Sequence, residues 1–393
     1  MRPEPDHSDE VSRYIAPLDG IRALAILLVM PHNIDLLKLP VPRLFVPAVL
    51  LSNAGWIGVQ LFFVLSGFLI SGNLLDTRGS GNYFSAFFGR RALRILPLYY
   101  AVLCITFVIA PLLATPPPQL HATASHQIWL WTFLANWTQP YDDGVYGFTH
   151  FWSLAVEEQF YLLWPFVVLF CRPRALFWVA LATAAIALAV RIGFAIAHFP
   201  HDTLYMFTIC RMDALALGAA TAALVRMPAV MERLRQRTSM VAAAGVITLL
   251  VALVITRGFG LYDVSTQTVG YTLLSLAFAL LVLLTTLPVR GMWRTLMRVL
   301  AWTPLRLIGR YSYGMYIFHL PLHVFFGTPL MHRIAPEPTA AQALAYSATL
   351  MVITFVLAAL SYELFERRFL RLKHKLMPVP RRPSAARVGR LAE

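Results

Sequence analysis

The sequence has few charged residues and few cysteines. Only 13% of its 393 residues are charged, against about 25% in an ordinary soluble domain. Its three cysteines, Cys104, Cys171 and Cys210, lie in apolar stretches without a CxxC pair, so neither a disulfide framework nor a metal site is indicated. The sequence also has no Walker loop and no GxGxxG string, and it therefore does not support a conventional nucleotide-binding fold.

Apolar residues dominate instead. They make up 58% of the chain and recur in long stretches between residues 18 and 366. Each stretch is close to the ~20 residues that a helix needs to cross a bilayer core. When Pro, Gly and charged residues are taken as breaks, hydropathy predicts about ten spans. These spans lie near residues 18–37, 57–74, 94–114, 151–171, 175–197, 206–226, 239–256, 269–289, 310–328 and 342–365. We predict an all-α, polytopic membrane protein.

The predicted organisation is one membrane domain with a short segment at each end. Residues 1–13 are expected to form a cytoplasmic N-terminal segment, and residues 14–370 the transmembrane domain. Residues 371–393 form a basic tail that we expect to be disordered and cytoplasmic. No internal repeat is visible, and no appended soluble domain is expected.

The net charge of +14 suggests either an anionic partner or the excess of basic residues that membrane proteins carry in their cytoplasmic segments. With the N-terminus in the cytoplasm, 26 of the 33 basic residues fall on the cytoplasmic side and four on the other. The longest outer loop, residues 115–150, has no Lys or Arg. This asymmetry predicts a protein of the cytoplasmic (inner) membrane with both termini in the cytoplasm, and it disfavours nucleic-acid binding.

Three basic residues fall inside or at the ends of spans: Arg22, Arg191 and Arg211. Charge is costly there and marks a candidate functional site. Snorkelling to the interface is the alternative for Arg22 and Arg191. Asp213 lies two residues after Arg211, so a local polar patch is expected.

A histidine and two carboxylates are candidates for acid–base chemistry. His32 lies roughly 21 Å along its span, and Glu157 and Glu158 roughly 10 Å along theirs from the opposite side. Both positions fall in the outer half of a core of ~30 Å. A carboxylate that orients one ring nitrogen makes the other a general base. Adjacent helix residues diverge by about 100°, so only one carboxylate can face His32, and we favour Glu158. The alternative is that these residues only tie helices together.

Two further strings are open to more than one interpretation. Ser66 lies in GWIGVQLFFVLSGFLISG (residues 55–72), where Ser and Gly favour close helix packing, and it lacks the flanking pattern of a nucleophile elbow. The arginines of FFGRRALRILPLYY (residues 87–100) could snorkel to lipid phosphate. They could equally clamp the phosphates of a cytosolic donor such as a nucleotide or acyl-CoA.

Six strings together resemble the integral-membrane acyltransferase 3 family. They are LDGIRALAILLVMPH (18–32), GVQLFFVLSGFLIS (58–71), FFGRRALRILPLYY (87–100), FWSLAVEEQFYLLWP (151–165), CRMDALALGA (210–219) and GRYSYGMYIFHLPL (309–322). They span nearly the whole chain in the family's order. The resemblance implies a ten-helix domain that takes an acyl group, usually acetyl, from cytoplasmic acyl-CoA to a hydroxyl on the far side. Surface carbohydrates and other extracytoplasmic molecules are the acceptors.

The resemblance also implies roles for individual residues. His32 would be the catalytic base, assisted by the acidic pair Glu157 and Glu158. The residues expected to hold the acyl-CoA are Arg22, Arg90, Arg91 and Arg94. Apart from the resemblance, we expect Trp152, Ser66, Arg211 and His319 to contact the acceptor.

The sequence departs from the family at two positions. Nine residues separate Arg22 from His32 where ten are usual, so Asn33 occupies the expected register. Pro31 could kink the helix and re-aim His32. Gln60 stands where an aspartate is usual. The hydrolase-like domain that some relatives carry is not expected, so the membrane part would complete transfer alone or with a partner.

The predicted function is therefore transmembrane O-acylation, most simply O-acetylation, of a carbohydrate or glycolipid. Glu158 would orient His32, and His32 would deprotonate the acceptor hydroxyl as it attacks the thioester. Direct transfer and a covalent acyl-enzyme both remain open. The alternative function is a transporter of an acyl donor or glycolipid, which broken helices near Pro31 and Ser66 would also fit.

Overall fold

The computed structural model describes residues 15–34, 52–113, 118–141 and 145–376. Every regular element in these ranges is helical, in agreement with the predicted all-α class. The predicted N-terminal segment 1–13 and the tail beyond residue 376 lie outside the described residues. Residues 371–376, which the sequence assigned to the tail, form the end of a helix, because Leu and basic residues alternate there at helical spacing.

The chain folds into a succession of long helices joined by shorter ones. The long helices are α2 (Ala16–Ile34), α4 (Ile57–Thr77), α5 (Tyr83–Cys104), α10 (Phe151–Phe170), α11 (Pro173–Ile196), α13 (Thr208–Val225), α15 (Thr238–Ile255), α16 (Tyr271–Leu284), α18 (Thr303–Pro321) and α20 (Ala340–Ser361). The shorter helices are α6 (Ala110–Leu113), α7 (Pro118–His126), α8 (Ile128–Trp131), α9 (Ala135–Thr138), α12 (His201–Met206), α14 (Pro228–Gln236), α17 (Gly291–Leu300), α19 (Thr328–Ile334) and α21 (Arg367–Leu376). Four π-helical segments interrupt or extend them: η3 (Ile105–Ile109), η4 (Thr266–Gly270), η5 (Leu322–Gly327) and η6 (Tyr362–Glu366).

Eight helices in the described ranges are long and apolar enough to cross a membrane. They run over Ile57–Thr77, Tyr83–Leu113, Phe151–Phe170, Pro173–Ile196, His201–Val225, Thr238–Ile255, Thr266–Leu284 and Ala340–Leu372. They correspond to eight of the predicted spans. The other two predicted spans are also helical, as α2 and as α18 with η5, but they carry the polar residues of the candidate site and are less apolar.

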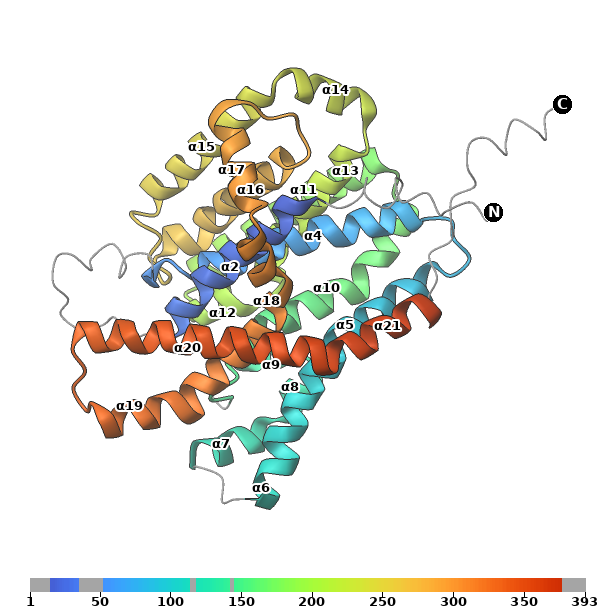
Figure 1. The fold of residues 1–393 in the computed structure, drawn as a ribbon. Coiled ribbons are helices and arrows are strands. Elements are labelled where there is room, and N and C mark those ends of the chain that lie inside the picture. Colours follow the sequence, from blue (N-terminus) through green and yellow to red (C-terminus); the bar gives the residue numbers. More distant parts are fainter. Residues whose placement is uncertain (1–14, 35–51, 114–117, 142–144, 377–393) are drawn as a thin grey trace.

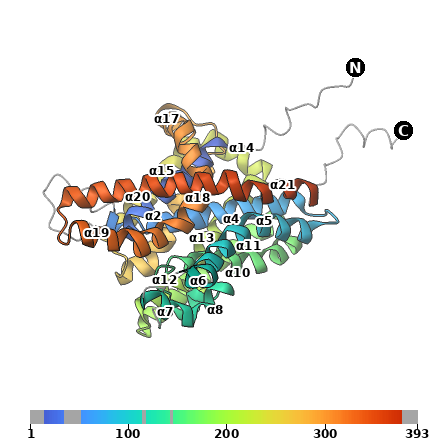
Figure 2. The same ribbon diagram turned by 60° about the horizontal axis from the view of Figure 1, so that its bottom comes forward.

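The helices pack around α4 and α13, which lie at the centre of the molecule. Helix α4 contacts α2, α10, α13 and α16, while α13 also contacts α11. Helix α18 packs between α2 and α20. In Figures 1 and 2, α20, η6 and α21 run as one continuous length across the front, and α14, α15 and α17 lie on the opposite side from α6, α7 and α8.

Two glycines allow α4 and α13 to approach closely. A Cβ atom built on Gly67 would lie 1.9 Å from the carbonyl oxygen of Leu215, and one on Gly218 would lie 2.0 Å from that of Val64. Small residues at such positions let helix backbones touch, which is a main source of packing energy in lipid. The central pair of helices therefore depends on having no side chain at these two positions.

We expect Gly218→Val to destabilise the protein, because the new side chain would collide with the backbone of α4. Overpacking of this kind costs about 1–3 kcal/mol or more. Thermal unfolding in detergent, followed by loss of the monodisperse peak, would measure the change. The matched control is Gly193→Ala in α11, where a Cβ meets nothing within 4 Å. Equal melting temperatures for the two variants would contradict the prediction.

Candidate active site

Five helices enclose a narrow cavity of about 120 Å³ in the middle of the molecule. Helices α2, α4, α5, α10 and α18 all contribute to its wall. Its polar lining consists of Arg22, Ser66, Arg91, Arg94, Ser153, Glu157, Tyr161, Ser312, Tyr313 and Tyr316. The remaining wall is aliphatic and aromatic. This inner cavity gathers residues from five of the six strings that the sequence singled out.

A wider basin of about 480 Å³ lies next to the inner cavity. It is lined by five arginines, which are Arg22, Arg90, Arg94, Arg306 and Arg310, and by the carboxylates of Asp19 and Glu366. Arg22, Arg94 and Tyr313 line both spaces, so the basin and the inner cavity adjoin. The charge pattern of the sequence predicts that the basin faces the cytoplasm, and this orientation stays a prediction.

The arginines of α5 divide between the two spaces because of their helical spacing. Arg90 and Arg94 are four residues apart and both line the basin, whereas Arg91 lines the inner cavity. The Arg91 guanidinium carbon lies 5.3 Å from the centre of the Tyr161 ring, within cation–π range. On α2, Arg22 is held by Asp19 through a 3.1 Å ion pair. The four arginines predicted to hold the donor thus line the two adjoining spaces.

Glu157 is the carboxylate that faces the inner cavity. Its Oε2 accepts a hydrogen bond of 3.0 Å from the Tyr161 hydroxyl, which is also hydrogen-bonded to Ser66 Oγ. All three side chains line the cavity. Glu158 points elsewhere, and its buried Oε1 has no hydrogen-bond partner among the described residues. The adjacent carboxylates therefore diverge, as helical geometry requires.

The structure does not bring His32 and Glu158 together. His32 Nδ1 donates to the carbonyl oxygen of Ser52 at 3.0 Å, and Ser52 Oγ donates to that of Pro31. A carbonyl can only accept, so Nδ1 carries the hydrogen and Nε2 is the basic nitrogen. Neither His32 nor Glu158 lines the inner cavity.

Asn33 faces the C-terminal end of α18. Its Nδ2 donates to His319 Nε2 at 2.8 Å, and His319 Nδ1 donates to the carbonyl oxygen of Tyr316 at 2.7 Å. His319 is fully buried, and its ring centre lies 4.7 Å from that of His150. His319 is therefore fixed as a neutral tautomer one layer beyond the inner cavity, where Tyr316 forms part of the wall.

Arg211 is fully buried among aromatic rings. Its guanidinium carbon lies 4.1 Å from the ring centre of Tyr271, 5.2 Å from Tyr205 and 5.6 Å from Trp152. Its Nη2 donates to Gln60 Oε1 at 2.5 Å. Arg211 and Trp152, both predicted to contact the acceptor, therefore pack against each other behind the cavity wall and do not line it.

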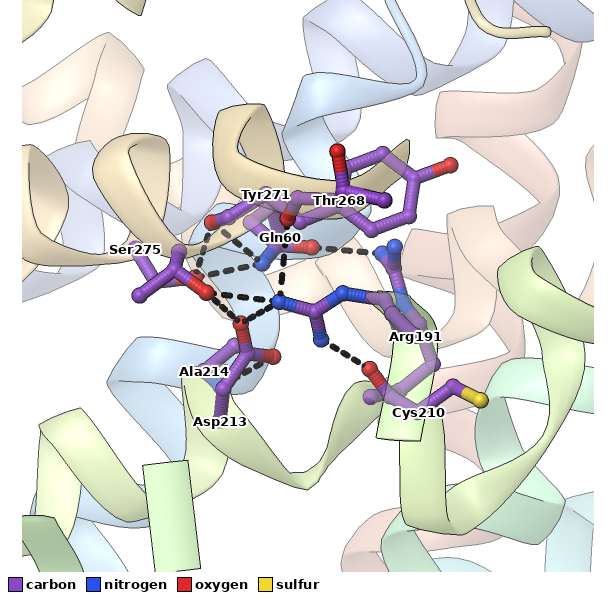
Figure 3. A network of polar contacts seen from close by, with 10 residues as sticks. Gln60, Arg191, Cys210, Asp213, Ala214, Thr268, Tyr271 and Ser275 are labelled. Atoms are coloured by element: carbon purple, nitrogen blue, oxygen red, sulfur yellow. Dashed lines mark hydrogen bonds and ion pairs between the residues drawn. The ribbon is translucent and has the colours of Figure 1, made fainter. Parts of the chain in front are cut away.

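A second buried arginine holds four helical segments together. Arg191 of α11 forms a 2.8 Å ion pair with Asp213 of α13, and both side chains are fully buried. Arg191 also donates to the Cys210 carbonyl and to Thr272 of α16, as Figure 3 illustrates for the first of these. Gln60 of α4 joins the same network by donating to the carbonyl oxygen of Tyr271. This network is a structural tie between α4, α11, α13 and α16.

Several residues that line the inner cavity or the basin were not predicted from the sequence. Tyr161 lies four residues after Glu157, and this i, i+4 spacing on one helix was a usable signal. Arg306 and Arg310 have the same spacing, but they were counted only as topology charges. Ser153 and Tyr316, which share a hydrogen bond of 2.5 Å at the end of the cavity, carry no sequence signal of their own. Within the described ranges, no three His, Cys, Asp or Glu residues gather into a possible metal site.

Comparison with known proteins adds a family to this geometry. A profile of the family described as "Acyltransferase domain" matches residues 15–363. The chain is 27% identical to the putative peptidoglycan O-acetyltransferase YrhL of Bacillus subtilis, over 92% of this chain and 56% of the relative. It is 26% identical to the peptidoglycan O-acetyltransferase OatA of Listeria monocytogenes, over 90% of this chain and 55% of the relative.

A third relative gives the same result at similar distance. The O-acetyltransferase OatA of Staphylococcus aureus is 25% identical over 80% of this chain and 51% of its own length. The chain therefore spans about half the length of the curated relatives it matches. No solved structure matches the chain.

We expect Asp213→Asn to unfold or strongly destabilise the protein, because it leaves Arg191 charged and unpaired in the interior. Breaking a buried ion pair by removing one partner costs about 3–5 kcal/mol. The double substitution Arg191→Met with Asp213→Leu should cost less than Asp213→Asn alone. Melting temperatures of the single and double variants in detergent would test this. A double variant less stable than the single one would show that the charge pair itself is not the dominant contribution.

Proposed function

Because this chain belongs to the acyltransferase family, we propose that it transfers an acyl group, specifically acetyl, from cytoplasmic acyl-CoA to a hydroxyl on the other side of the membrane. The names of its relatives support O-acetylation as the reaction. They also support a peptidoglycan-type carbohydrate as the acceptor. Helices long and apolar enough to cross a membrane support a transfer from one side of the bilayer to the other.

The observation that carries the proposal is the pair of adjoining spaces. Acyl-CoA has phosphate groups at one end and a thin, uncharged arm that ends in the thioester at the other. A basin with five arginines suits the phosphates, because guanidinium forks match phosphate oxygens. A narrow cavity of about 120 Å³ suits the end of the arm and a short acyl group. The thioester would thus reach the inner cavity while the phosphates of the donor stay in the basin on the cytoplasmic side.

The proposed chemistry is attack of the acceptor hydroxyl on the thioester carbonyl. The oxygen–carbon bond forms, the carbon–sulfur bond breaks, and CoA leaves as a thiolate that takes up a proton. Arg22, Arg91 and Arg94 line the inner cavity and would stabilise the developing oxyanion. Glu157 accepts the Tyr161 hydrogen bond and keeps that hydroxyl and Ser66 oriented toward the cavity.

We propose His32 as the base that takes the proton of the acceptor hydroxyl. The Ser52 carbonyl, rather than Glu158, would then orient its ring, because the Nδ1 hydrogen bond leaves Nε2 as the basic nitrogen. His32 lies near the end of α2 that the charge pattern assigns to the outer side, where an acceptor would arrive.

His32→Ala should lower acetyl transfer by about 10²- to 10⁴-fold, the usual contribution of a general base. Purified protein in nanodiscs would receive acetyl-CoA with a labelled acetyl group and peptidoglycan fragments, and labelled acceptor would be counted. Donor binding should stay unchanged. Equal transfer by wild type and variant would remove His32 from the mechanism. Movement of label across the membrane without release of CoA would favour a transporter.

The two adjacent glutamates provide an internal comparison. We expect Glu157→Gln to reduce transfer by about 100-fold, because a neutral amide changes the charge that faces the arginines of the inner cavity. Glu158→Gln should have a much smaller effect, since Glu158 lies outside that cavity and the Ser52 carbonyl, rather than Glu158, orients His32. Initial rates at saturating acetyl-CoA would compare the variants. A larger loss for Glu158→Gln would reverse the assignment.

A further inference from the structure

The basin is built by residues that the family resemblance does not assign as well as by those it does. Arg90 and Arg94 come from α5, Arg22 comes from α2, and Arg306 and Arg310 come from α18. The π-helical segment η6 closes the wall with Tyr362 and Glu366. A single turn of π-helix within a long helix is frequently found at a functional site. The basin therefore has two arginine-bearing walls and an aromatic one.

The charge in the basin exceeds what a single phosphate needs. Its five arginines face two carboxylates, Asp19 and Glu366. Asp19 is bound to Arg22 at 3.1 Å, and Glu366 accepts a hydrogen bond from Ser361 at 3.1 Å. The formal excess of three positive charges is concentrated in one concave surface, which raises the local concentration of polyanions.

Arg90 contributes to this wall a buried hydrogen-bond donor that has no acceptor in the protein's described residues. The residue is 8% exposed and lines the basin, yet its buried Nη1 has no hydrogen-bond partner among the described residues. Its Nη2 has only a 3.5 Å contact with Asn73 Oδ1. A buried donor left without an acceptor is costly, and native structures retain one where a ligand or water completes it.

Arg310 and Tyr362 form a flat surface at the other wall. The Arg310 guanidinium carbon lies 4.7 Å from the centre of the Tyr362 ring, and its Nη2 lies 3.6 Å from Glu363 Oε1. The ion pair and the stacking hold the guanidinium beside the basin. An aromatic ring next to a guanidinium is a surface on which a nucleobase stacks.

We propose that the basin recognises the adenosine 3′,5′-bisphosphate end of the donor, with Arg306, Arg310 and Tyr362 as specificity-determining residues. In this arrangement the α5 arginines bind its diphosphate, Arg306 and Arg310 bind its 3′-phosphate, and the adenine lies against Tyr362. The diphosphate alone does not balance the three excess positive charges of the basin, and the 3′-phosphate supplies the remaining negative charge. This inference rests on acyl-CoA being the donor, and it adds that the protein discriminates against donors without the 3′-phosphate.

The test compares two donors on the full-length protein in nanodiscs. Wild type should bind acetyl-CoA about 10- to 100-fold more tightly than acetyl-dephospho-CoA, as expected for one or two charge-assisted hydrogen bonds. Free adenosine 3′,5′-bisphosphate should displace labelled acetyl-CoA, whereas AMP should do so far less. Equal affinity for the two donors would overturn the proposal.

Two variants and a control connect this preference to named residues. Arg310→Gln should reduce the ratio of the two affinities to within a few-fold, because it weakens only the phosphorylated donor. Tyr362→Leu should weaken both donors about equally, since both carry adenine. The control is Arg235→Gln on the exposed surface of α14, which should leave both affinities unchanged. Thermal melts confirm that each variant is folded, and an unaltered ratio in folded Arg310→Gln overturns the assignment.

Anionic lipid headgroups share phosphate chemistry with the nucleotide, so the assay is run in two lipids. Nanodiscs of zwitterionic lipid alone should give the same donor preference as those with added phosphatidylglycerol. If phosphatidylglycerol displaces the donor and removes the preference, the basin is a lipid site and the proposal is wrong. If acetyl-CoA is neither bound nor consumed under any condition, the proposed function fails. If it is consumed without regard to the 3′-phosphate, only this inference fails.

Discussion

A guanidinium cannot be left unsolvated in hydrocarbon, and the positions of the arginines in this protein follow from that constraint. Arg191 and Arg211 lie within the helix bundle, where protein groups replace water: a carboxylate for the first, and aromatic rings with the Gln60 amide for the second. Arg22 and Arg94 lie along spaces that are open to a ligand. The first pair fixes the helices, and the second leaves charge available for chemistry.

Helix α18 connects these requirements along one face. Arg306, Arg310, Tyr313 and Tyr316 recur at helical spacing, so a single helix runs from the basin, past the junction, to the end of the inner cavity. Its last turn carries His319, which is hydrogen-bonded to Asn33 of α2. The helix is less apolar than its neighbours because it carries polar and basic residues that line the two spaces.

Hydropathy predicted most of the fold, and it predicted less of the site. Long apolar stretches located the eight helices of the described ranges that are long and apolar enough to cross a membrane. Arg90, Arg91 and Arg94, which the sequence singled out as a cluster, line the two adjoining spaces, and their role in binding the donor stays a prediction. The choice between Glu157 and Glu158 depended on the rotation of α10, and Asn33 faces His319 because of the rotation of α2. Rotation is set by packing against other helices, which a single sequence does not encode locally. Arg306 and Arg310 were assigned to topology because a charge that serves topology and one that serves binding look alike in sequence.

Three side chains, Arg22, Arg94 and Tyr313, belong to both the basin and the inner cavity. A ligand that extends through both spaces would therefore contact these three residues at the junction between its two ends. A residue that lines only the basin or only the inner cavity would contact one end of such a ligand, so the two sets of residues can change independently over evolution. A substitution at the junction would alter contacts with both ends at once. Specificity for a new acyl group or a new carrier would therefore evolve through residues that line only one of the two spaces.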